Sequence, residues 1–154
     1  MTALGIKRIV VGVDGSEHAG SALDWAVLVA KAMDSEVIAV YALDIPVWAA
    51  DPFTTAQPPQ FDPEWRTEIR QAFEERWCKP LRDAGVRYRS VMEDGRPATV
   101  IDSVADAEGA DLVVLGRRGR GEVAELVLGS ISHEVVLASK RPVLLIPRPK
   151  AGPD

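Results

Sequence analysis

Two short segments in the C-terminal third of the chain combine glycine, arginine and serine in a way that suits an anion. The first is Gly116-Arg117-Arg118-Gly119-Arg120-Gly121, and the second, after a short gap, is Gly129-Ser130-Ile131-Ser132. Glycines let backbone N–H groups converge on an anion, and a helix that starts near the second segment adds unpaired N–H donors and a favourable dipole. The hydroxyls of Ser130 and Ser132 can also donate to phosphate oxygens. The two segments together predict a phosphate site built in two parts.

Alternating strand and helix patterns must position these segments. Short apolar runs and one alternating run predict five strands, over residues 9–13, 37–43, 86–91, 112–115 and 142–147. Apolar residues at helical spacing predict helices from a cap at Ser16 to Met33, over 65–81, from Pro97 to a stop at Gly109, and over 126–138. This alternation indicates an α/β fold with a five-stranded, parallel, open, Rossmann-like sheet and helices on both faces.

The order of the strands follows from the position of the ligand. In open α/β sheets the ligand lies beyond the carboxyl ends of the strands, where the strand order reverses. The turn Gly12-Val13-Asp14 ends the first predicted strand, and the segment from Gly116 to Gly119 follows the fourth. If both turns share one ligand, these two strands are neighbours, which predicts the order 3-2-1-4-5.

Several of these residues resemble the universal stress protein family. The pattern Gly116-x2-Gly119-x9-Gly129-Ser130 is similar to the G-x2-G-x9-G-[S/T] signature of its ATP-binding members. The resemblance extends over nearly the whole chain, because further family-like segments occur in the expected order: Val13-Asp14-Gly15-Ser16, Gly95-Arg96-Pro97, Gly109-Ala110-Asp111 and Arg141-Pro142-Val143-Leu144. One departure is Gly12, where some ATP-binding members carry proline.

The resemblance implies a role for each matching residue. Asp14 is expected near the ribose and adenine with Gly12 beside it, and Ala42 is expected to meet adenine through its backbone. The phosphates are expected at Gly116, Arg117, Arg118 and Gly119, and at Gly129, Ser130, Ile131 and Ser132. The implied ligand is ATP, with Mg²⁺, and the implied function is a regulatory or sensing module in the stress response that assembles as a homodimer.

Simpler interpretations compete with the nucleotide. Asp14-Gly15-Ser16 is also ordinary turn and cap chemistry, and Ser130 alone could be a helix cap. The run from Gly116 to Gly121 could be a solvated surface loop, or a short arginine-glycine segment that binds RNA. The RNA interpretation is the weaker one, because such segments are longer and repetitive and the net charge of −5 disfavours polyanions.

An enzyme is the alternative to a binding module. Fast phosphoryl transfer needs a positioned cation, metal-binding acids and a group that orients the nucleophile. The sequence has neither a Gly-x4-Gly-Lys-[Ser/Thr] segment nor an evident general base beside the glycines. The alternative functions are therefore a slow ATP hydrolase, or a protein that prefers another adenine nucleotide such as AMP or a cyclic nucleotide. No catalytic residue is assigned.

Composition sets the remaining expectations. We expect one domain over residues 1–154, with the proline-rich stretch 46–63 as an irregular loop or lid. The single cysteine, Cys78, fits a cytoplasmic protein, and two distant histidines offer no metal site. No apolar stretch approaches the roughly 20 residues that cross a bilayer. The last strand is apolar and nearly uncharged, so we expect homodimers to form through it.

Overall fold

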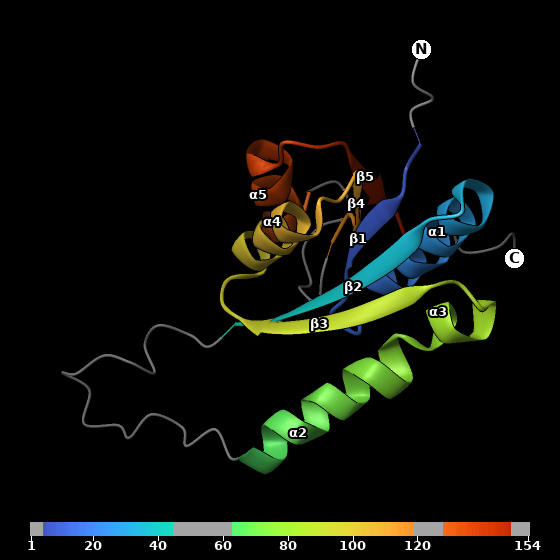
Figure 1. The fold of residues 1–154 in the computed structure, drawn as a ribbon. Coiled ribbons are helices and arrows are strands. Elements are labelled where there is room, and N and C mark those ends of the chain that lie inside the picture. Colours follow the sequence, from blue (N-terminus) through green and yellow to red (C-terminus); the bar gives the residue numbers. More distant parts are fainter. Residues whose placement is uncertain (1–4, 45–62, 119–127, 149–154) are drawn as a thin grey trace, which may run out of the picture.

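Five parallel strands form one sheet in the order β3-β2-β1-β4-β5, as the sequence predicts (Figure 1). The structure is a computed structural model that describes residues 5–44, 63–118 and 128–148. The strands are β1 (Arg8–Gly12), β2 (Glu36–Leu43), β3 (Tyr88–Asp94), β4 (Leu112–Gly116) and β5 (Val143–Ile146). β1, β2 and β4 are apolar and almost wholly buried because helices cover both of their faces.

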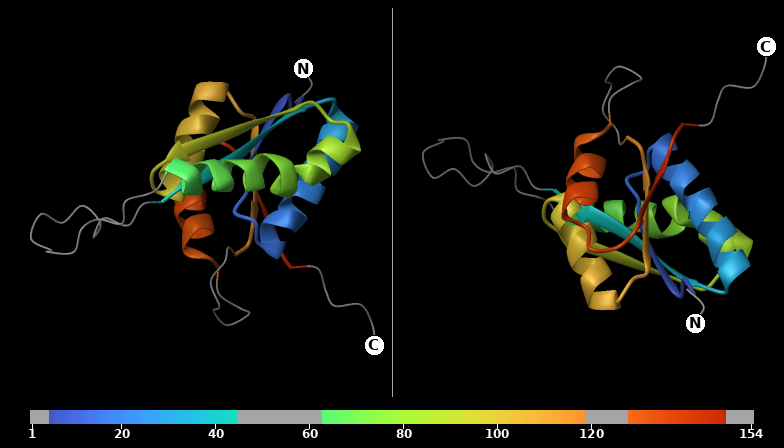
Figure 2. Two further views of the ribbon diagram at one scale, coloured as in Figure 1. Left: turned by 90° about the horizontal axis from the view of Figure 1, so that it is seen from below. Right: turned by 90° about the horizontal axis from the view of Figure 1, so that it is seen from above.

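Helices cover both sides of the sheet (Figure 2). One side carries α1 (Glu17–Met33), the π-helical segment η2 (Ala72–Trp77) and α3 (Lys79–Ala84), and the other carries α4 (Pro97–Glu108) and α5 (Ser130–Ala138). Side chains alternate between the two layers, so that Ile9 and Val11 pack toward α1 whereas Val10 packs toward α4. The predicted α/β fold is therefore confirmed.

Several predicted helix ends are confirmed. Ser16 caps α1, where its hydroxyl accepts a hydrogen bond from Ala19 N at 3.2 Å. Pro97 is the first residue of α4, and Gly109 ends that helix with a φ of 60°, a conformation that glycine adopts without strain. Among the described residues, no helix is both long and apolar enough to cross a membrane.

The helix predicted over 65–81 is wrong in part. The chain forms α2 (Pro63–Gln71), then η2 and α3, and α2 buries none of its side chains. Trp65, one of the apolar residues whose spacing predicted this helix, is 37% exposed, whereas Phe73 and Leu81 are fully buried. The π-helical segment widens the turn, so side chains before and after it do not share one face. The stretch predicted as a loop or lid at 46–63 lies outside the described residues except for Pro63, which begins α2.

Cys78 packs into the core rather than facing solvent. Its side chain is fully buried against α1 and β2. Burial raises the pKa of the thiol to about 11, which keeps it protonated and unreactive near neutral pH.

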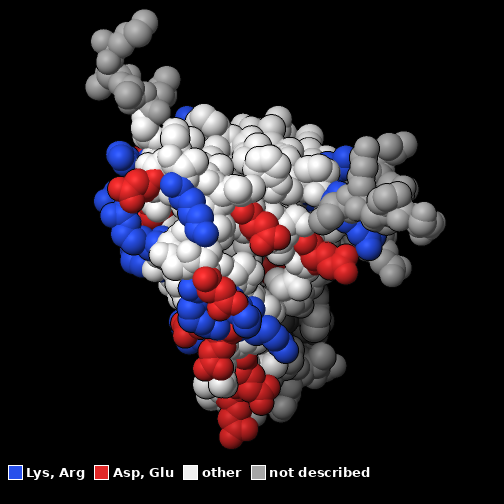
Figure 3. Space-filling view, turned by 90° about the vertical axis from the view of Figure 1, so that its right-hand side faces the viewer, with Lys and Arg blue, Asp and Glu red and all other residues white. Residues whose placement is uncertain are grey.

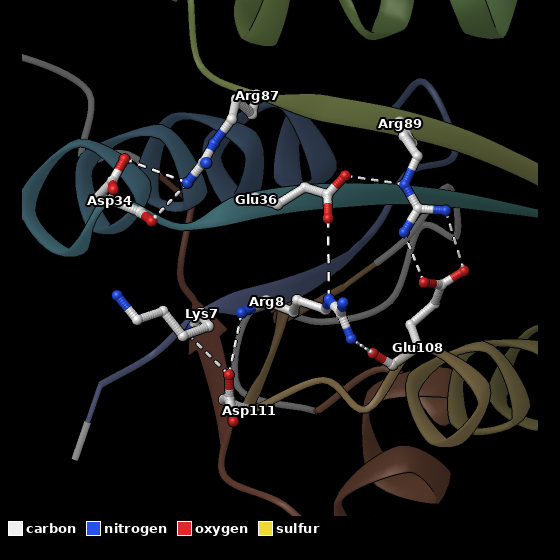
Figure 4. A network of polar contacts seen from close by, with 8 residues as sticks. All are labelled: Lys7, Arg8, Asp34, Glu36, Arg87, Arg89, Glu108 and Asp111. Carbon is white, nitrogen blue, oxygen red and sulfur yellow. Dashed lines mark hydrogen bonds and ion pairs between the residues drawn. The ribbon is translucent and has the colours of Figure 1, made fainter.

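A polar network ties the amino ends of the strands together (Figure 4). One carboxylate oxygen of Asp111 accepts hydrogen bonds from Lys7 N at 2.7 Å and Arg8 N at 3.0 Å. Arg89 bridges Glu36 and Glu108, and its hydrogen bonds hold the pKa of Glu108 below the usual value. Gly109 and Asp111 of the family-like Gly-Ala-Asp segment thus have structural roles, since the glycine ends α4 and the aspartate fixes the start of β1.

We expect Asp111→Ala to lower the free energy of unfolding by roughly 1–2 kcal/mol, because two backbone N–H groups lose a charged acceptor at an exposed position. Asp111→Asn keeps an acceptor oxygen and should lose about half as much. Urea denaturation of the three proteins measures this. A loss below about 0.5 kcal/mol in Asp111→Ala would show that water replaces the carboxylate at little cost.

Candidate functional site

A cleft lies at the carboxyl ends of β1, β2 and β4, where the strand order reverses between β1 and β4. It brings together most of the residues predicted from the sequence: Gly12, Asp14, Ala42, Gly116, Arg118, Ile131 and Ser132. Arg117, Gly129 and Ser130 lie next to this lining without belonging to it. Gly119 lies outside the described residues.

One wall of the cleft is apolar. It is formed by side chains of β2, α4 and β4, among them Val40, Ile101 and Leu115. Gly12 forms part of the floor, and a Cβ atom at this position would lie 2.6 Å from Leu115 Cδ2 and 3.2 Å from Ile101 Cδ1. A side chain at residue 12 would therefore crowd this wall. Apolar walls in ligand clefts suit hydrophobic or aromatic groups.

Ala42 offers its backbone to the cleft. In β2, Val40 O accepts from Val13 N at 2.9 Å on the β1 side, whereas Leu43 O accepts from Gly95 N on the β3 side. Ala42 has the same orientation as Val40 because peptide groups alternate along a strand. β1 ends at Gly12, so within the described part of the chain no β1 residue pairs with Ala42. Its N–H and C=O groups are thus placed to contact a ligand.

Asp14 combines a turn role with a place in the cleft. Its Oδ1 atom accepts a hydrogen bond from Ser16 N at 2.9 Å, and Gly15 adopts a φ of 78°. This is the aspartate turn expected from the simpler interpretation. The carboxyl group is half-buried and lines the cleft, so the turn fixes the carboxylate beside any ligand there.

The segments around Gly116 and Gly129 are joined at their base. Arg117 N donates to Ile146 O at 2.8 Å, and Gly129 N donates to Arg117 O at 3.0 Å. The buried Ser132 hydroxyl donates to Gly116 O at 2.9 Å. The contact of this hydroxyl with a phosphate stays a prediction; in the structure the hydroxyl donates to a backbone carbonyl.

The second segment lies at the start of α5, as expected. The helix itself begins four residues after the predicted start at residue 126. Helix α5 begins at Ser130, and Gly129 occupies the N-cap position. Ser130 is therefore not the cap, and its side chain is exposed. The first described backbone bond within α5 runs from His133 N to Gly129 O, so the N–H groups of Ser130, Ile131 and Ser132 have no acceptor inside the helix.

Several lining residues were not predicted as site residues: Tyr41, Pro97, Ile101 and Leu115. In the sequence, Tyr41 and Leu115 belonged to predicted strands and Ile101 to the helix predicted from Pro97 to Gly109, and Pro97 stood out only as the start of that helix and in a family-like turn. Their position could have identified two of them as site residues, because Tyr41 and Leu115 lie near the carboxyl ends of strands beside the expected reversal of strand order.

The fold is that of an open α/β protein with a cleft at the reversal of strand order. Residues 5–147 match the sequence profile of the universal stress protein family. The chain belongs to the universal stress protein family, as its sequence motifs indicated.

Relatives match over nearly the full length of the chain. A universal stress protein of Thermus aquaticus is 34% identical over 142 residues, which cover 91% of this chain and 98% of the relative. The solved structure of MJ0577 from Methanocaldococcus jannaschii is similar with a TM-score of 0.79 at 26% identity, over 95% of this chain and 99% of that one. A universal stress protein crystallised in complex with cAMP is similar with a TM-score of 0.66 at 26% identity, over 94% and 99% of the two chains.

Proposed function

We propose that this protein binds ATP, with Mg²⁺, and acts as a regulatory or sensing module of the stress response in the cytoplasm. The observation that carries the proposal is the cleft, which unites Gly12, Asp14 and Ala42 with Gly116 and the start of α5. A relative that was solved with cAMP supports an adenine nucleotide as the ligand class.

The geometry suggests how the ligand lies. The adenine ring fits against the apolar wall, with its edge at the backbone of Ala42. The Asp14 carboxylate is placed to accept hydrogen bonds from the ribose. The phosphates extend over Gly116 and Arg118 toward the N–H groups at the start of α5, which have no acceptor inside that helix. The helix dipole favours negative charge there.

In this proposal the protein binds ATP without hydrolysing it rapidly. The described cleft presents Asp14 as a carboxylate and Arg118 as a cation, and Asp14 already accepts a turn hydrogen bond. Phosphoryl transfer needs a residue that orients the nucleophile in addition to charge stabilisation. Overnight incubation with ATP and analysis of the products separates the two classes, since a binding module leaves ATP intact.

The ligand that the protein carries tests the proposal directly. The protein is purified without added nucleotide, denatured, and the released small molecules are identified by mass spectrometry. We expect an adenine nucleotide, in an amount close to that of the protein. Protein that carries none, and that after dialysis binds neither ATP, ADP, AMP nor cAMP at millimolar concentration, would contradict the proposal.

For Asp14→Ala we expect weaker binding of ATP, ADP and AMP alike, by about ten- to a hundredfold, because a hydrogen bond to a charged group contributes roughly 1.5–3 kcal/mol. Asp14→Asn keeps the turn acceptor and controls for damage to the turn. Calorimetric titration measures the affinities. Unchanged affinity in a folded Asp14→Ala protein would restrict Asp14 to its turn role.

We also propose a homodimer that pairs β5 with its copy. β5 is an edge strand without a charged residue, and Val143, Leu144 and Leu145 are only partly buried. The two helices that contact β5, one on each side of the sheet, both carry exposed apolar side chains: Trp25 (48%) and Leu28 (59%) on α1, and Val136 (44%) and Leu137 (74%) on α5. Figure 3 shows few charged side chains on the upper part of the α1 face. Such an edge favours pairing with a second copy.

Leu145→Lys should shift the protein toward monomer, because a charge enters the paired edge. Leu137→Lys changes a mostly exposed side chain, so we expect it to leave the fold intact and also to weaken the dimer. Sedimentation at high micromolar concentration measures the assembly. A wild-type protein that sediments as a monomer there would contradict the dimer.

A further inference from the structure

Three hydrogen bonds connect the residues on either side of the cleft's glycine segments. Ser132 Oγ donates to Gly116 O at 2.9 Å, Gly129 N donates to Arg117 O at 3.0 Å, and Arg117 N donates to Ile146 O at 2.8 Å. These bonds join the end of β4, the start of α5 and the end of β5. Among them, the Ser132 bond is the only one made by a side chain.

The Ser132 hydroxyl uses its proton in the hydrogen bond to Gly116 O. Its residue is 3% exposed, and a hydroxyl has one proton to donate. Turning that proton toward a phosphate would leave Gly116 O without its Ser132 donor in a partly buried setting, which costs free energy. Gly116 itself is held from the opposite side, because the site of a Cβ atom there lies only 2.6 Å from His18 C and 2.7 Å from His18 O.

We infer that Ser132 is a positioning residue, which fixes the start of α5 against the end of β4 before any ligand arrives. This inference rests on the proposed nucleotide site and assigns Ser132 a role different from phosphate contact. The N–H groups of Ser130 and Ile131, which have no acceptor inside α5, then lie at a fixed distance from the backbone of Gly116. Such preorganisation raises affinity because less ordering is needed when the ligand binds.

Hydrogen exchange in the ligand-free protein tests these hydrogen bonds without any nucleotide. In the wild type we expect the amides of Arg117 and Gly129 to exchange slowly. In Ser132→Ala we expect both amides to exchange about tenfold faster, with the amides of β4 unchanged. Ser130→Ala, an exposed serine in the same helical turn, is the matched control and should exchange like the wild type. Ser132→Thr keeps a hydroxyl donor and should restore slow exchange.

Affinity measurements complete the test. We expect Ser132→Ala to bind Mg-ATP about tenfold more weakly and adenosine as the wild type does. Unprotected Arg117 and Gly129 amides in the wild type, or exchange that Ser132→Ala does not change, would overturn the inference. The inference would also be overturned if Ser132→Ala exchanged these amides faster but bound Mg-ATP as tightly as the wild type. If hydrogen exchange behaves as expected but the wild type binds no nucleotide, the proposed function fails while the structural role of Ser132 stands.

Discussion

Ser130→Asp should nearly abolish ATP binding and leave the ligand-free fold as stable as the wild type, or slightly more stable. Ser130 is the exposed first residue of α5, directly where the phosphates are expected. Two unit charges 4 Å apart repel by about 4 kcal/mol near a protein surface. Even with screening by water at this exposed position, we expect a loss of about a hundredfold or more in affinity, which corresponds to roughly 2.7 kcal/mol.

The fold responds in the opposite direction to the same substitution. An aspartate in the first turn of a helix interacts favourably with the dipole, by about 0.3–1 kcal/mol. Ser130→Ala removes only the hydroxyl and should reduce affinity by roughly 0.5–1.5 kcal/mol. Ser130→Asn is the neutral control of similar shape to aspartate. Calorimetric titration and melting of the ligand-free proteins provide both values, and undiminished ATP binding by Ser130→Asp would place the phosphates elsewhere.

Gly116→Ala should destabilise the fold itself, by roughly 1–3 kcal/mol. A Cβ atom at Gly116 would lie 2.6 Å from His18 C and 2.7 Å from His18 O. These are backbone atoms of the first turn of α1, so either the helix or the end of β4 must shift. The glycine is thus required by close packing between two elements, independently of any ligand.

Gly20→Ala is the matched control for that substitution. Gly20 is also near the start of α1, but a Cβ atom there meets nothing within 4 Å. Alanine forms helices better than glycine by about 0.8–1 kcal/mol, so this variant should be as stable as the wild type or more stable. Urea denaturation ranks the three proteins. If Gly116→Ala is as stable as Gly20→Ala, β4 and α1 are packed less tightly than the structure shows.

The strand order could be predicted from the sequence because two turns at strand ends were assumed to share one ligand. The apolar runs at 9–13 and 112–115 identified buried parallel strands, and the glycine segments indicated which strands end side by side. The structure confirms this order. The predicted order also places β3 at the edge of the sheet, and the alternation of polar and apolar residues in its sequence agrees with one solvent-facing side.

The roles of individual serines could not be predicted in the same way. Ser130 and Ser132 are two residues apart in a helix, so one is exposed while the other is buried. Their assignment depends on where α5 begins, and sequence patterns locate helix ends only to within a few residues. The π-helical segment at 72–77 was missed for a related reason, since apolar spacing alone does not reveal one widened turn.

The most direct test of the account is the melting temperature of ligand-free protein with and without Mg-ATP. A ligand at about 100 times its dissociation constant adds roughly 2.7 kcal/mol to the free energy of unfolding, which raises the melting temperature of a domain of this size by several degrees. We expect that rise with wild type and with Ser130→Ala, and none with Ser130→Asp. No shift in wild-type protein at millimolar Mg-ATP would contradict the proposal that this cleft binds ATP.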